Sequence, residues 1–441
     1  MQKCNYFHTA YNILFKVLKD GAYLQIELNN ALNINDEESK IITKIVYGVV
    51  QHNLELDNII SILALKKPKL SADIMLKIGI YCLLFLNSVP DYAVCNEITE
   101  LTKTLGKQGM SGFINAVLKK VCSNKNAYLF PTEDENTTVQ THLSTKYSYP
   151  EWIIEKLLKA YPTDFLEKIL ERGEHKTHIR VNKFKITALE FEKLLNSNHI
   201  PFEKSNVNGY YVNYRQIKEH QDFNPLYTVQ SAGSMTVCHT LNIKSGEKVL
   251  DVCAAPGGKS VYLSELGAVV TAWDIYEHRV NLINSYCKRM NANVFAVVKD
   301  ATKYDENYKE KFDCVLTDVP CSGLGVAGKK ADILLNRNAE SIDELTALQA
   351  SIMNTASKYV KTGGCLLYST CTILPQENED IVDTFLSRHL DFKAENISVF
   401  KKVLYVKDLS LKKEIRGEPY LQLFANIDSD EGFFMARLRK L

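Results

Sequence analysis

Two cysteines are the residues of this chain most clearly placed for chemistry. Cys321 lies in the segment Asp318-Val-Pro-Cys-Ser-Gly and Cys371 lies in Tyr368-Ser-Thr-Cys-Thr, and each follows an apolar run typical of a buried strand. Because an open α/β sheet forms its active site beyond the carboxyl ends of its strands, we expect both thiols in one crevice. Two thiols near the carboxyl group of Asp318 indicate covalent attack by sulfur.

A glycine-rich turn upstream predicts a binding site in the same crevice. It follows an expected strand that ends at Asp251, opens a helix, and consists of Cys253, Ala254, Ala255, Pro256, Gly257, Gly258 and Lys259. Small residues let a ligand approach the backbone, and free N–H groups at a helix start favour polar or anionic groups. The first glycine of a P-loop is replaced by Cys253, and the dinucleotide pattern is absent, so a phosphate cradle fits poorly.

Two acids follow the next expected strands and narrow the choice of ligand. An acid at the end of the second strand, here Asp274, commonly binds ribose hydroxyls, and Asp300 after the third strand could reach an adenine amino group. A nucleoside without phosphate, such as S-adenosylmethionine, fits this pattern, although helix capping is the alternative for each acid. Lys259 is a candidate source of positive charge for a thiol, which must lose its proton to attack.

Alternating strands and helices are expected to position these residues from about residue 236 to the end. The alternation predicts a largely parallel, doubly wound sheet. The expected strands are 248–252, 268–274, 294–299, 312–317 and 364–368, and the expected helices are 259–266, 278–290 and 340–360.

The preceding sequence predicts two further domains. Apolar residues recur at helical spacing through residues 1–125, which indicates an all-α bundle. One of its helices is expected over 74–86, capped by Ser71 or Asp73. A polar linker is expected over 126–145, and mixed helices and short strands over 146–235 predict a small α+β module.

The composition of the 441 residues is that of a globular multidomain protein, with 46% hydrophobic and 24% charged residues. No apolar run is long enough for a bilayer, and the first residues lack the apolar core of a signal peptide, so a cytoplasmic location without membrane association is expected. None of the eleven cysteines forms a Cys-x-x-Cys pair, and the ten histidines form no ligand motif. We therefore expect no disulfides and no metal.

A net charge of +1 neither requires nor excludes a nucleic-acid partner, because a local patch is sufficient. One candidate patch is the stretch 101–125, which contains five lysines and no acidic residue. A solvated helix face and an RNA-facing surface are both open for this stretch.

Residues 146–441 resemble the RNA 5-methylcytosine methyltransferases of the NOL1/Nop2/Sun group. The resemblance rests on the three motifs above and on His178-Ile-Arg-Val-Asn, Val229-Gln-Ser-Ala-Gly-Ser-Met and Asp430-Glu-Gly-Phe-Phe-Met-Ala. It implies a Rossmann-like class I methyltransferase domain that uses S-adenosylmethionine. It also implies that Cys371 attacks carbon 6 of a cytosine and that Cys321 assists release. Asp318 is expected to hydrogen-bond the base and to contribute to the cofactor site. Arg180 and Gln230 in these segments either position RNA or the cofactor domain, or serve as packed structural residues.

The N-terminal bundle resembles a NusB-type RNA-binding domain, at Lys77-Ile-Gly-Ile-Tyr-Cys-Leu-Leu and Gly112-Phe-Ile-Asn-Ala-Val-Leu-Lys. Its fusion to this catalytic domain resembles the RsmB/Sun (Fmu) family, which implies 16S rRNA of an unassembled or partly assembled small subunit as partner. A tRNA or another rRNA cytosine is the alternative substrate, and a non-catalytic RNA-binding assembly factor is the alternative class. Two positions depart from the family pattern: Val319 replaces the usual Ala, and the segment 329–333 lacks the Pro that commonly precedes its Asp.

Overall fold

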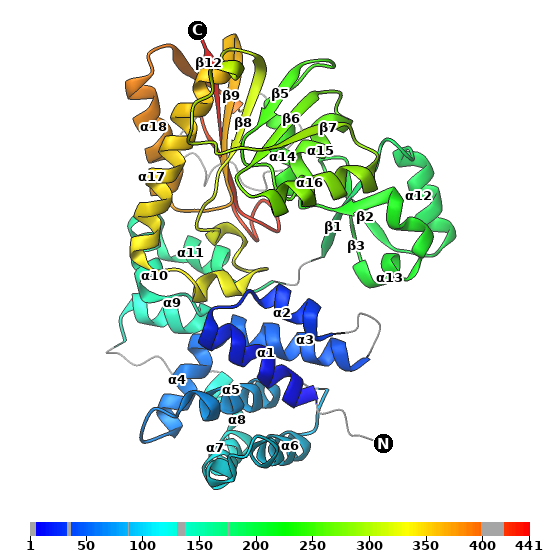
Figure 1. Cartoon of the computed structure of the whole chain (residues 1–441). Coiled ribbons are helices and arrows are strands. Elements are labelled where there is room, and N and C mark those ends of the chain that lie inside the picture. Colours follow the sequence, from blue (N-terminus) through cyan, green and yellow to red (C-terminus); the bar gives the residue numbers. More distant parts are fainter. Residues whose placement is uncertain (1–5, 33–36, 87, 130–136, 174–175, 398–418) are drawn as a thin grey trace. The chain divides into compact units, whose positions relative to one another are not determined.

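The computed structural model describes residues 6–32, 37–86, 88–129, 137–173, 176–397 and 419–441 (Figure 1). By contacts, the chain divides into two compact units, one formed by 1–159 with 330–337 and the other by 160–329 with 338–441. Within the described ranges, no helix is long and apolar enough to cross a membrane, and no three His, Cys, Asp or Glu residues are grouped to hold a metal ion.

The first unit is helical, as the sequence predicts. Its core is built from inward-facing residues such as Leu14, Val46, Ile78 and Leu118, all of which are fully buried. The helices are α1 (Tyr6–Asp20), α2 (Leu24–Ala31), α3 (Glu37–Gln51), α4 (Asn53–Leu63), α5 (Leu70–Phe85), α6 (Asp91–Thr104), η1 (Gln108–Met110), α7 (Ser111–Ser123), α8 (Lys125–Leu129), α9 (Val139–Tyr147) and α10 (Glu151–Ala160), the last of which ends at the boundary between the units.

Helix α5 begins earlier than expected, and the predicted caps are wrong. Lys69 is the N-cap and makes no side-chain capping bond, whereas Ser71 and Asp73 lie inside the helix. Asp73 instead forms an ion pair with Lys77, one turn later, at 3.2 Å. Because α5 is buried on all sides from residue 71 to 84, packing rather than a capping side chain determines where it starts.

A short segment from the second half of the sequence completes the first unit. The 3-10 helix η5 (Ala331–Leu335) places Ala331 in the helical core, and the backbone N–H of Leu24 donates to Asp332 Oδ2 at 3.2 Å. Ala331 and Asp332, in the segment that departs from the family pattern, therefore pack within the bundle, whereas Lys329 at the start of that segment pairs with Glu431 at 3.3 Å in the second unit.

The expected linker 126–145 is partly helical, because α8 and α9 extend into it from either side, while residues 130–136 lie outside the described part of the chain. Thr138 caps α9 by accepting the N–H of Thr141 at 3.1 Å.

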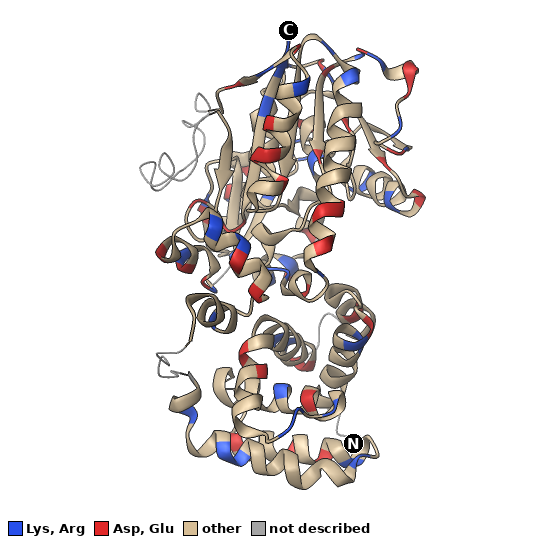
Figure 2. Cartoon of the chain, turned by 90° about the vertical axis from the view of Figure 1, so that its left-hand side faces the viewer, with Lys and Arg blue, Asp and Glu red and all other residues tan. Residues whose placement is uncertain are grey.

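The lysines of the stretch 101–125 are partly neutralised. Lys103 pairs with Glu100 at 2.5 Å, and Lys125 pairs with Asp91 at 2.6 Å. Figure 2 shows basic and acidic residues interspersed along the helices of both units. This pairing reduces the positive charge of the stretch, and an RNA-facing role for it remains a prediction.

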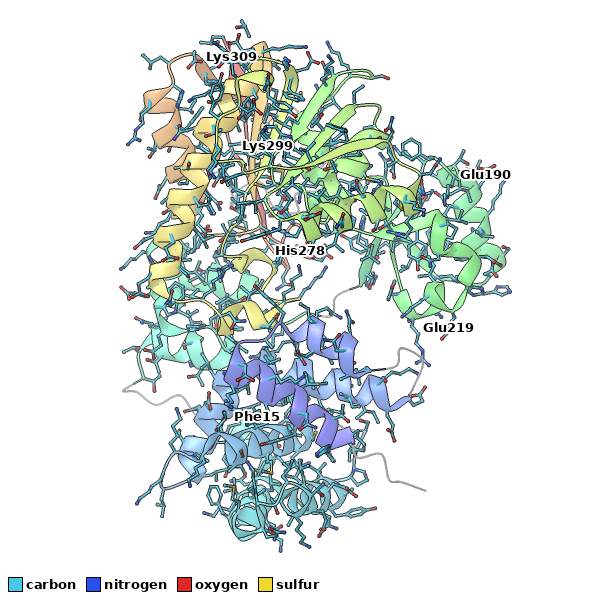
Figure 3. All side chains as sticks on the ribbon, viewed as in Figure 1. Phe15, Glu190, Glu219, His278, Lys299 and Lys309 are labelled. Atoms are coloured by element: carbon cyan, nitrogen blue, oxygen red, sulfur yellow. The ribbon has the colours of Figure 1, made fainter. Side chains whose placement is uncertain are left out.

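The second unit begins with a small α+β module. Its sheet has the order β2-β3-β1-β4, and the paired strands are antiparallel. Helix α12 starts with a capping box, in which Glu190 accepts the N–H of Thr187 at 3.0 Å (Glu190 is labelled in Figure 3). The elements are α11 (Thr163–Leu170), β1 (Thr177–Val181), α12 (Ala188–Ser197), β2 (Phe202–Lys204), β3 (Gly209–Val212), α13 (Tyr214–Glu219), η2 (Gln221–Leu226) and β4 (Tyr227–Val229).

An eight-stranded sheet carries the motif residues. Its order is β10-β12-β9-β8-β5-β6-β7, with β11 paired to β12. The five strands from β9 to β7 are parallel, which confirms the predicted doubly wound sheet, whereas β10, β11 and β12 are antiparallel additions that the sequence did not indicate. The strands are β5 (Lys248–Asp251), β6 (Val269–Asp274), β7 (Val294–Val298), β8 (Phe312–Asp318), β9 (Val360–Thr370), β10 (Phe392–Glu395), β11 (Leu421–Leu423) and β12 (Phe433–Lys440).

Helices cover both faces of this sheet (Figure 1). Helices α14, α15 and α16 pack on one face, and α17 and α18 pack on the other. The expected helix 340–360 is too long, because α17 ends at Ala356 and β9 already begins at Val360. The bounds are α14 (Ala232–Leu241), α15 (Gly258–Glu265), α16 (Glu277–Met290), η3 (Glu306–Tyr308), η4 (Leu324–Val326), α17 (Ala339–Ala356), η6 (Ser357–Tyr359), η7 (Pro375–Glu377) and α18 (Glu379–Arg388).

Candidate active site

The two thiols lie together beyond the ends of neighbouring strands. Asp318 closes β8 and pairs in register with Ser369 near the end of β9, so the loops that follow start side by side. The Sγ atoms of Cys321 and Cys371 are 3.3 Å apart, and the backbone N–H of Cys371 donates to Cys321 Sγ at 3.3 Å. The structure thus places both predicted thiols in one site.

A glycine allows the two thiol loops to approach each other. The N–H of Gly325 donates to the carbonyl of Cys371 at 3.0 Å, and its own carbonyl accepts the N–H of Gly432 at 2.7 Å. A Cβ at Gly325 would lie 2.5 Å from the Gly432 oxygen and 2.9 Å from the Cys371 oxygen. No side chain fits there. The close approach of the segments that contain Gly325, Cys371 and Gly432 therefore requires glycine at position 325.

The side-chain ammonium of Lys259 is hydrogen-bonded to a carboxylate and not to Cys321 or Cys371. Its Nζ donates to Asp318 Oδ2 at 2.7 Å, and Ser369 Oγ donates to Asp318 Oδ1 at 2.7 Å. Burial alone would lower the pKa of Lys259, but the charge of Asp318 and the hydrogen bond to it outweigh burial and raise that pKa. Lys259 therefore stays protonated and holds the Asp318 carboxylate in place.

The glycine-rich turn has the sharp geometry expected of a ligand cradle. Strand β5 ends at Asp251, and α15 begins at Gly258, after Gly257 with φ of 104°. A Cβ at Gly257 would touch Ile283 and Tyr286, the nearest atom at 3.3 Å, so both backbone conformation and space favour glycine.

The buried carboxyl group of Asp251 lies behind this turn. Its Oδ2 accepts a hydrogen bond from Ser260 Oγ at 2.6 Å, and burial raises its pKa to about 7. The Oδ1 atom is buried and has no hydrogen-bond partner in the described structure. A polar ligand at the turn could supply one.

The two strand-end acids make local contacts. Asp274 Oδ1 accepts the N–H of Tyr276 at 3.3 Å, and its Oδ2 lies 3.4 Å from Arg279, a partner that sequence reasoning missed. Asp300 Oδ1 accepts bonds from the backbone N–H and the hydroxyl of Thr302, at 2.9 and 2.6 Å, which lower its pKa. Both acids thus bond locally, as in the capping alternative, and both also stand at the carboxyl edge of neighbouring strands.

The cysteine of the turn is close to several of these acids. Burial raises the pKa of the Cys253 thiol, and three carboxylates raise it further, namely Asp251, Asp318 and Asp274. Such a thiol stays neutral, so it contributes bulk and not charge to the site. Carboxylates around a glycine turn suit a ligand with hydroxyl, amino and cationic groups, which are the groups of S-adenosylmethionine.

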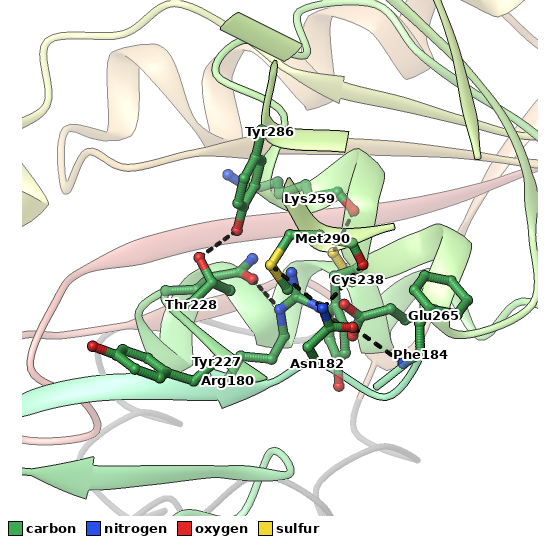
Figure 4. A network of polar contacts seen from close by, with 12 residues as sticks. Arg180, Asn182, Phe184, Tyr227, Thr228, Cys238, Lys259, Glu265, Tyr286 and Met290 are labelled. Atoms are coloured by element: carbon green, nitrogen blue, oxygen red, sulfur yellow. Dashed lines mark hydrogen bonds and ion pairs between the residues drawn. The ribbon is translucent and has the colours of Figure 1, made fainter. Parts of the chain in front are cut away.

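A buried network joins the α+β module to the helix that starts at the glycine turn (Figure 4). The fully buried Arg180 forms an ion pair with Glu265 and donates from Nε to Gln230 Oε1 at 2.7 Å. Its guanidinium carbon also lies 4.7 Å from the centre of the Tyr262 ring. Glu265 and Tyr262 both belong to α15. The contacts of Arg180 and Gln230 agree with the interpretation of both as packed structural residues, and Arg180, being fully buried, is not available to RNA.

Sequence reasoning missed a second buried cluster, next to the thiols. Glu377 and Gln349 are fully buried, and their side chains are hydrogen-bonded at 2.9 Å. Glu377 stands in a polar run that reads as a solvated helix start, and Gln349 in an ordinary amphipathic helix. Their sequence surroundings carry no signal that these polar groups are buried.

Family models match three parts of the chain. The model described as "16S rRNA methyltransferase RsmB/F" matches residues 238–439, and the "NusB family" model matches residues 8–123. The model described as "Methyltr_RsmF/B-like, ferredoxin-like domain" matches residues 149–212. These matches agree with the fold expected for each region.

Curated relatives match over the whole length. The probable ribosomal RNA small subunit methyltransferase B of Bacillus subtilis is 30% identical over 462 residues, covering 100% of both chains. The ribosomal RNA small subunit methyltransferase B of Photorhabdus laumondii is 29% identical over 420 residues, covering 92% of each.

Solved structures share the fold. The crystal structure of PH0851 has a TM-score of 0.77 at 24% identity, covering 99% of this chain and 98% of that one. A methyltransferase homolog from Pyrococcus horikoshii has a TM-score of 0.58 at 25% identity, covering 69% of this chain and 100% of its own.

Proposed function

The chain belongs to the RsmB/Sun family of S-adenosylmethionine-dependent 16S rRNA methyltransferases, and from this premise we propose that it methylates carbon 5 of a cytosine through a covalent bond between Cys371 and the base. The observation that carries the proposal is the 3.3 Å separation of two thiols beyond β8 and β9, next to the Lys259–Asp318 pair. A cytosine C5 methyl transfer needs a nucleophile, a group that binds the base, and help with release, and these residues can provide all three.

The cofactor is assigned to the glycine-rich turn and the strand-end acids. When bound, S-adenosylmethionine supplies an electrophilic methyl group on a sulfonium. Asp274 is assigned to the ribose hydroxyls, Asp300 to the adenine amino group, and the backbone of residues 253–259 to the remaining polar atoms. The cradle of Gly257 and the unpartnered Oδ1 of Asp251 support this assignment.

Cys371 is assigned as the nucleophile. Carbon 5 of cytosine is a poor nucleophile until a thiolate adds to carbon 6 and turns the ring into an enamine. The Cys371 thiol gives its proton to solvent, its sulfur forms the bond to carbon 6, and the electrons of the C5=C6 bond become available at carbon 5.

Asp318 is assigned to the base. Its carboxylate can accept a hydrogen bond from the exocyclic amino group and from a protonated N3, where the charge of the adduct is stabilised. Lys259 and Ser369 hold the two oxygens, at 2.7 Å each, so the carboxylate is oriented before the base arrives.

Cys321 is assigned to release. After methylation, the proton on carbon 5 passes to water, the C5=C6 bond re-forms, and the bond between carbon 6 and the Cys371 sulfur breaks. A Cys321 thiol 3.3 Å from that sulfur can give it a proton as it leaves, and solvent then restores the proton of Cys321.

The proposed substrate is a cytosine in 16S rRNA of an unassembled or partly assembled small subunit. The base must leave its stack to enter such a site, which favours a loop or another single-stranded region. We also propose that residues 1–125, 146–235 and 236–441 act as an RNA-binding domain, a connecting module and a catalytic domain.

Methyl transfer from tritiated S-adenosylmethionine to unmodified 16S rRNA tests the proposal, with the methylated position mapped. One 5-methylcytosine is expected, with no methylation by Cys371→Ala and a trapped covalent RNA adduct with Cys321→Ala. Unimpaired methylation by Cys371→Ala would contradict the mechanism. Transfer to tRNA but not to 16S rRNA would support the alternative substrate, and cofactor binding without any transfer would support an assembly factor.

A further inference from the structure

A buried carboxylate lies behind the loop that carries Cys321. Glu377 is fully buried in η7, and its Oε1 accepts the backbone N–H of Ser322 at 2.8 Å and the Gln349 amide at 2.9 Å. Ser322 directly follows Cys321 in the sequence. The carboxylate is therefore attached to the loop of one thiol.

Further hydrogen bonds fix Glu377 in this place. The Gln349 amide also donates to the carbonyl of Pro320 at 2.9 Å, so Gln349 and Glu377 together hold the residues on either side of Cys321. The phenol of Tyr368, in the middle of the sheet, donates to the Glu377 carbonyl at 2.6 Å. These contacts make Glu377 part of the rigid base of the site.

The Glu377 carboxylate is buried without a paired cation among the residues that the structure describes. The Oε2 atom is buried without a hydrogen-bond partner, and the described residues form no ion pair with Glu377. A negative charge in such surroundings acts strongly on nearby groups, because little water screens it.

Several groups around Cys321 change the pKa of its thiol, in opposite directions. The hydrogen bond from Cys371, burial, the charge of a Cys371 thiolate and the charge of Glu377 all raise the pKa of Cys321 well above its usual value, while the backbone N–H of Cys371 opposes them. The Tyr368 phenol beside them is neutral, since burial raises its pKa well above 10. Of the two charges named here, that of Glu377 comes from a group other than the partner thiol.

We propose that Glu377 decides which of the two adjacent thiols is the nucleophile, because its buried negative charge behind the Cys321 loop keeps the proton on Cys321 and leaves Cys371 as the sulfur that ionises. This inference rests on the proposed function and deepens it. The retained proton on Cys321 is the one that release requires, so a single positioning residue serves both the attack and the release.

The alkylation of the two thiols as a function of pH tests the proposal without RNA. The full-length protein, saturated with S-adenosylmethionine, is treated with iodoacetamide between pH 6 and 10, and singly modified species at low conversion are quantified by mass spectrometry. In the protein without substitutions, Cys371 is expected to react at least about tenfold faster than Cys321 at pH 8. The reason is that a difference of one pKa unit changes the thiolate fraction about tenfold. Equal rates and equal pH profiles would overturn the proposal, and this measurement needs no variant.

Substitutions separate the charge from the packing. Glu377→Gln keeps the shape and removes the charge, and is expected to move the alkylation profile of Cys321 to lower pH and to speed its reaction about tenfold at pH 8. Tyr368→Phe removes a hydrogen bond to Glu377 and keeps the charge, so it is the matched control and should leave the Cys321 profile in place. An unchanged Cys321 profile in a folded Glu377→Gln protein, or equal shifts in both variants, would overturn the role of the charge.

These experiments distinguish failure of the inference about Glu377 from failure of the proposed function. Slow Cys321 alkylation that Glu377→Gln accelerates, combined with full methylation by Cys371→Ala, would leave the effect of Glu377 standing and remove the catalytic assignment. Equal alkylation rates of the two thiols, combined with loss of methylation in Cys371→Ala, would leave the catalytic assignment standing and remove the role of Glu377.

Discussion

Lys259 Nζ lies 2.7 Å from Asp318 Oδ2, so one ion pair joins the glycine-rich turn to the loop that carries Cys321. The lysine side chain is 14% exposed and the aspartate 24%. In such partly desolvated surroundings the pair orients both segments, and the segment assigned to the cofactor is held against the segment assigned to the base.

We expect Lys259→Met to reduce methyl transfer about 100-fold, since it removes a positioned charge from the carboxylate that is assigned to the base. Single-turnover kinetics would measure the effect on methyl transfer, and calorimetry would measure any effect on the binding of S-adenosylmethionine. Lys303→Met is the control, because Lys303 is 82% exposed and lies 3.6 Å from Asp300. Similar losses in both variants would contradict a specific role for the Lys259–Asp318 pair.

We expect Arg180→Met to destabilise the protein by about 3–5 kcal/mol, because Glu265 would be left buried and unpaired. The Glu265 side chain is fully buried, and burial raises its pKa even beside Arg180. Urea unfolding of both single variants and of Arg180→Met with Glu265→Leu gives a double-mutant cycle. The double variant should recover much of the loss, and purely additive losses would show that the two side chains do not act as a pair.

We expect Gly325→Ala to impair methyl transfer while cofactor binding is retained. The new Cβ would lie 2.5 Å from one backbone oxygen and 2.9 Å from another, so the Cys371 turn must shift, at a cost of about 1–3 kcal/mol. Gly109→Ala is the control, since no atom lies within 4 Å of its added Cβ. Normal turnover by Gly325→Ala would mean that the thiol loops tolerate a wider separation.

The buried Asp251 predicts a pH dependence of stability. Burial raises its pKa to about 7, whereas an unfolded aspartate titrates near 3.9. Between these values the folded protein holds a proton that the unfolded chain releases, so the contribution of Asp251 is complete below about pH 4 and is lost as pH rises through 7.

We therefore expect the stability of the unmodified protein, relative to Asp251→Asn, to fall between pH 4 and pH 8. Urea unfolding of both proteins at several pH values in this range measures the difference. A constant difference across the range would show that Asp251 is ionised throughout.

Local patterns in the sequence were sufficient to predict the five parallel strands and the turns that carry the motif residues, but not the three antiparallel strands β10, β11 and β12. The alternation after residue 236 predicted the parallel strands, because buried parallel strands read as short apolar runs between amphipathic helices. The positions of Cys321 and Cys371 after two such runs placed both thiols at one sheet edge, and they lie 3.3 Å apart. These features depend on residues that are close together along the chain.

Only the tertiary structure decided which groups meet across that edge. Lys259 pairs with Asp318, 59 residues further along the chain, and the Glu377 carboxylate binds the backbone of Ser322, 55 residues away. Ala331 packs into the core of the N-terminal bundle. Such contacts depend on strand register and on the burial of polar side chains by other segments. A charged residue in a polar run is expected to be solvated when only its sequence neighbours are considered. The sequence therefore predicted the thiols of the site, whereas only the fold determined which charges act on them.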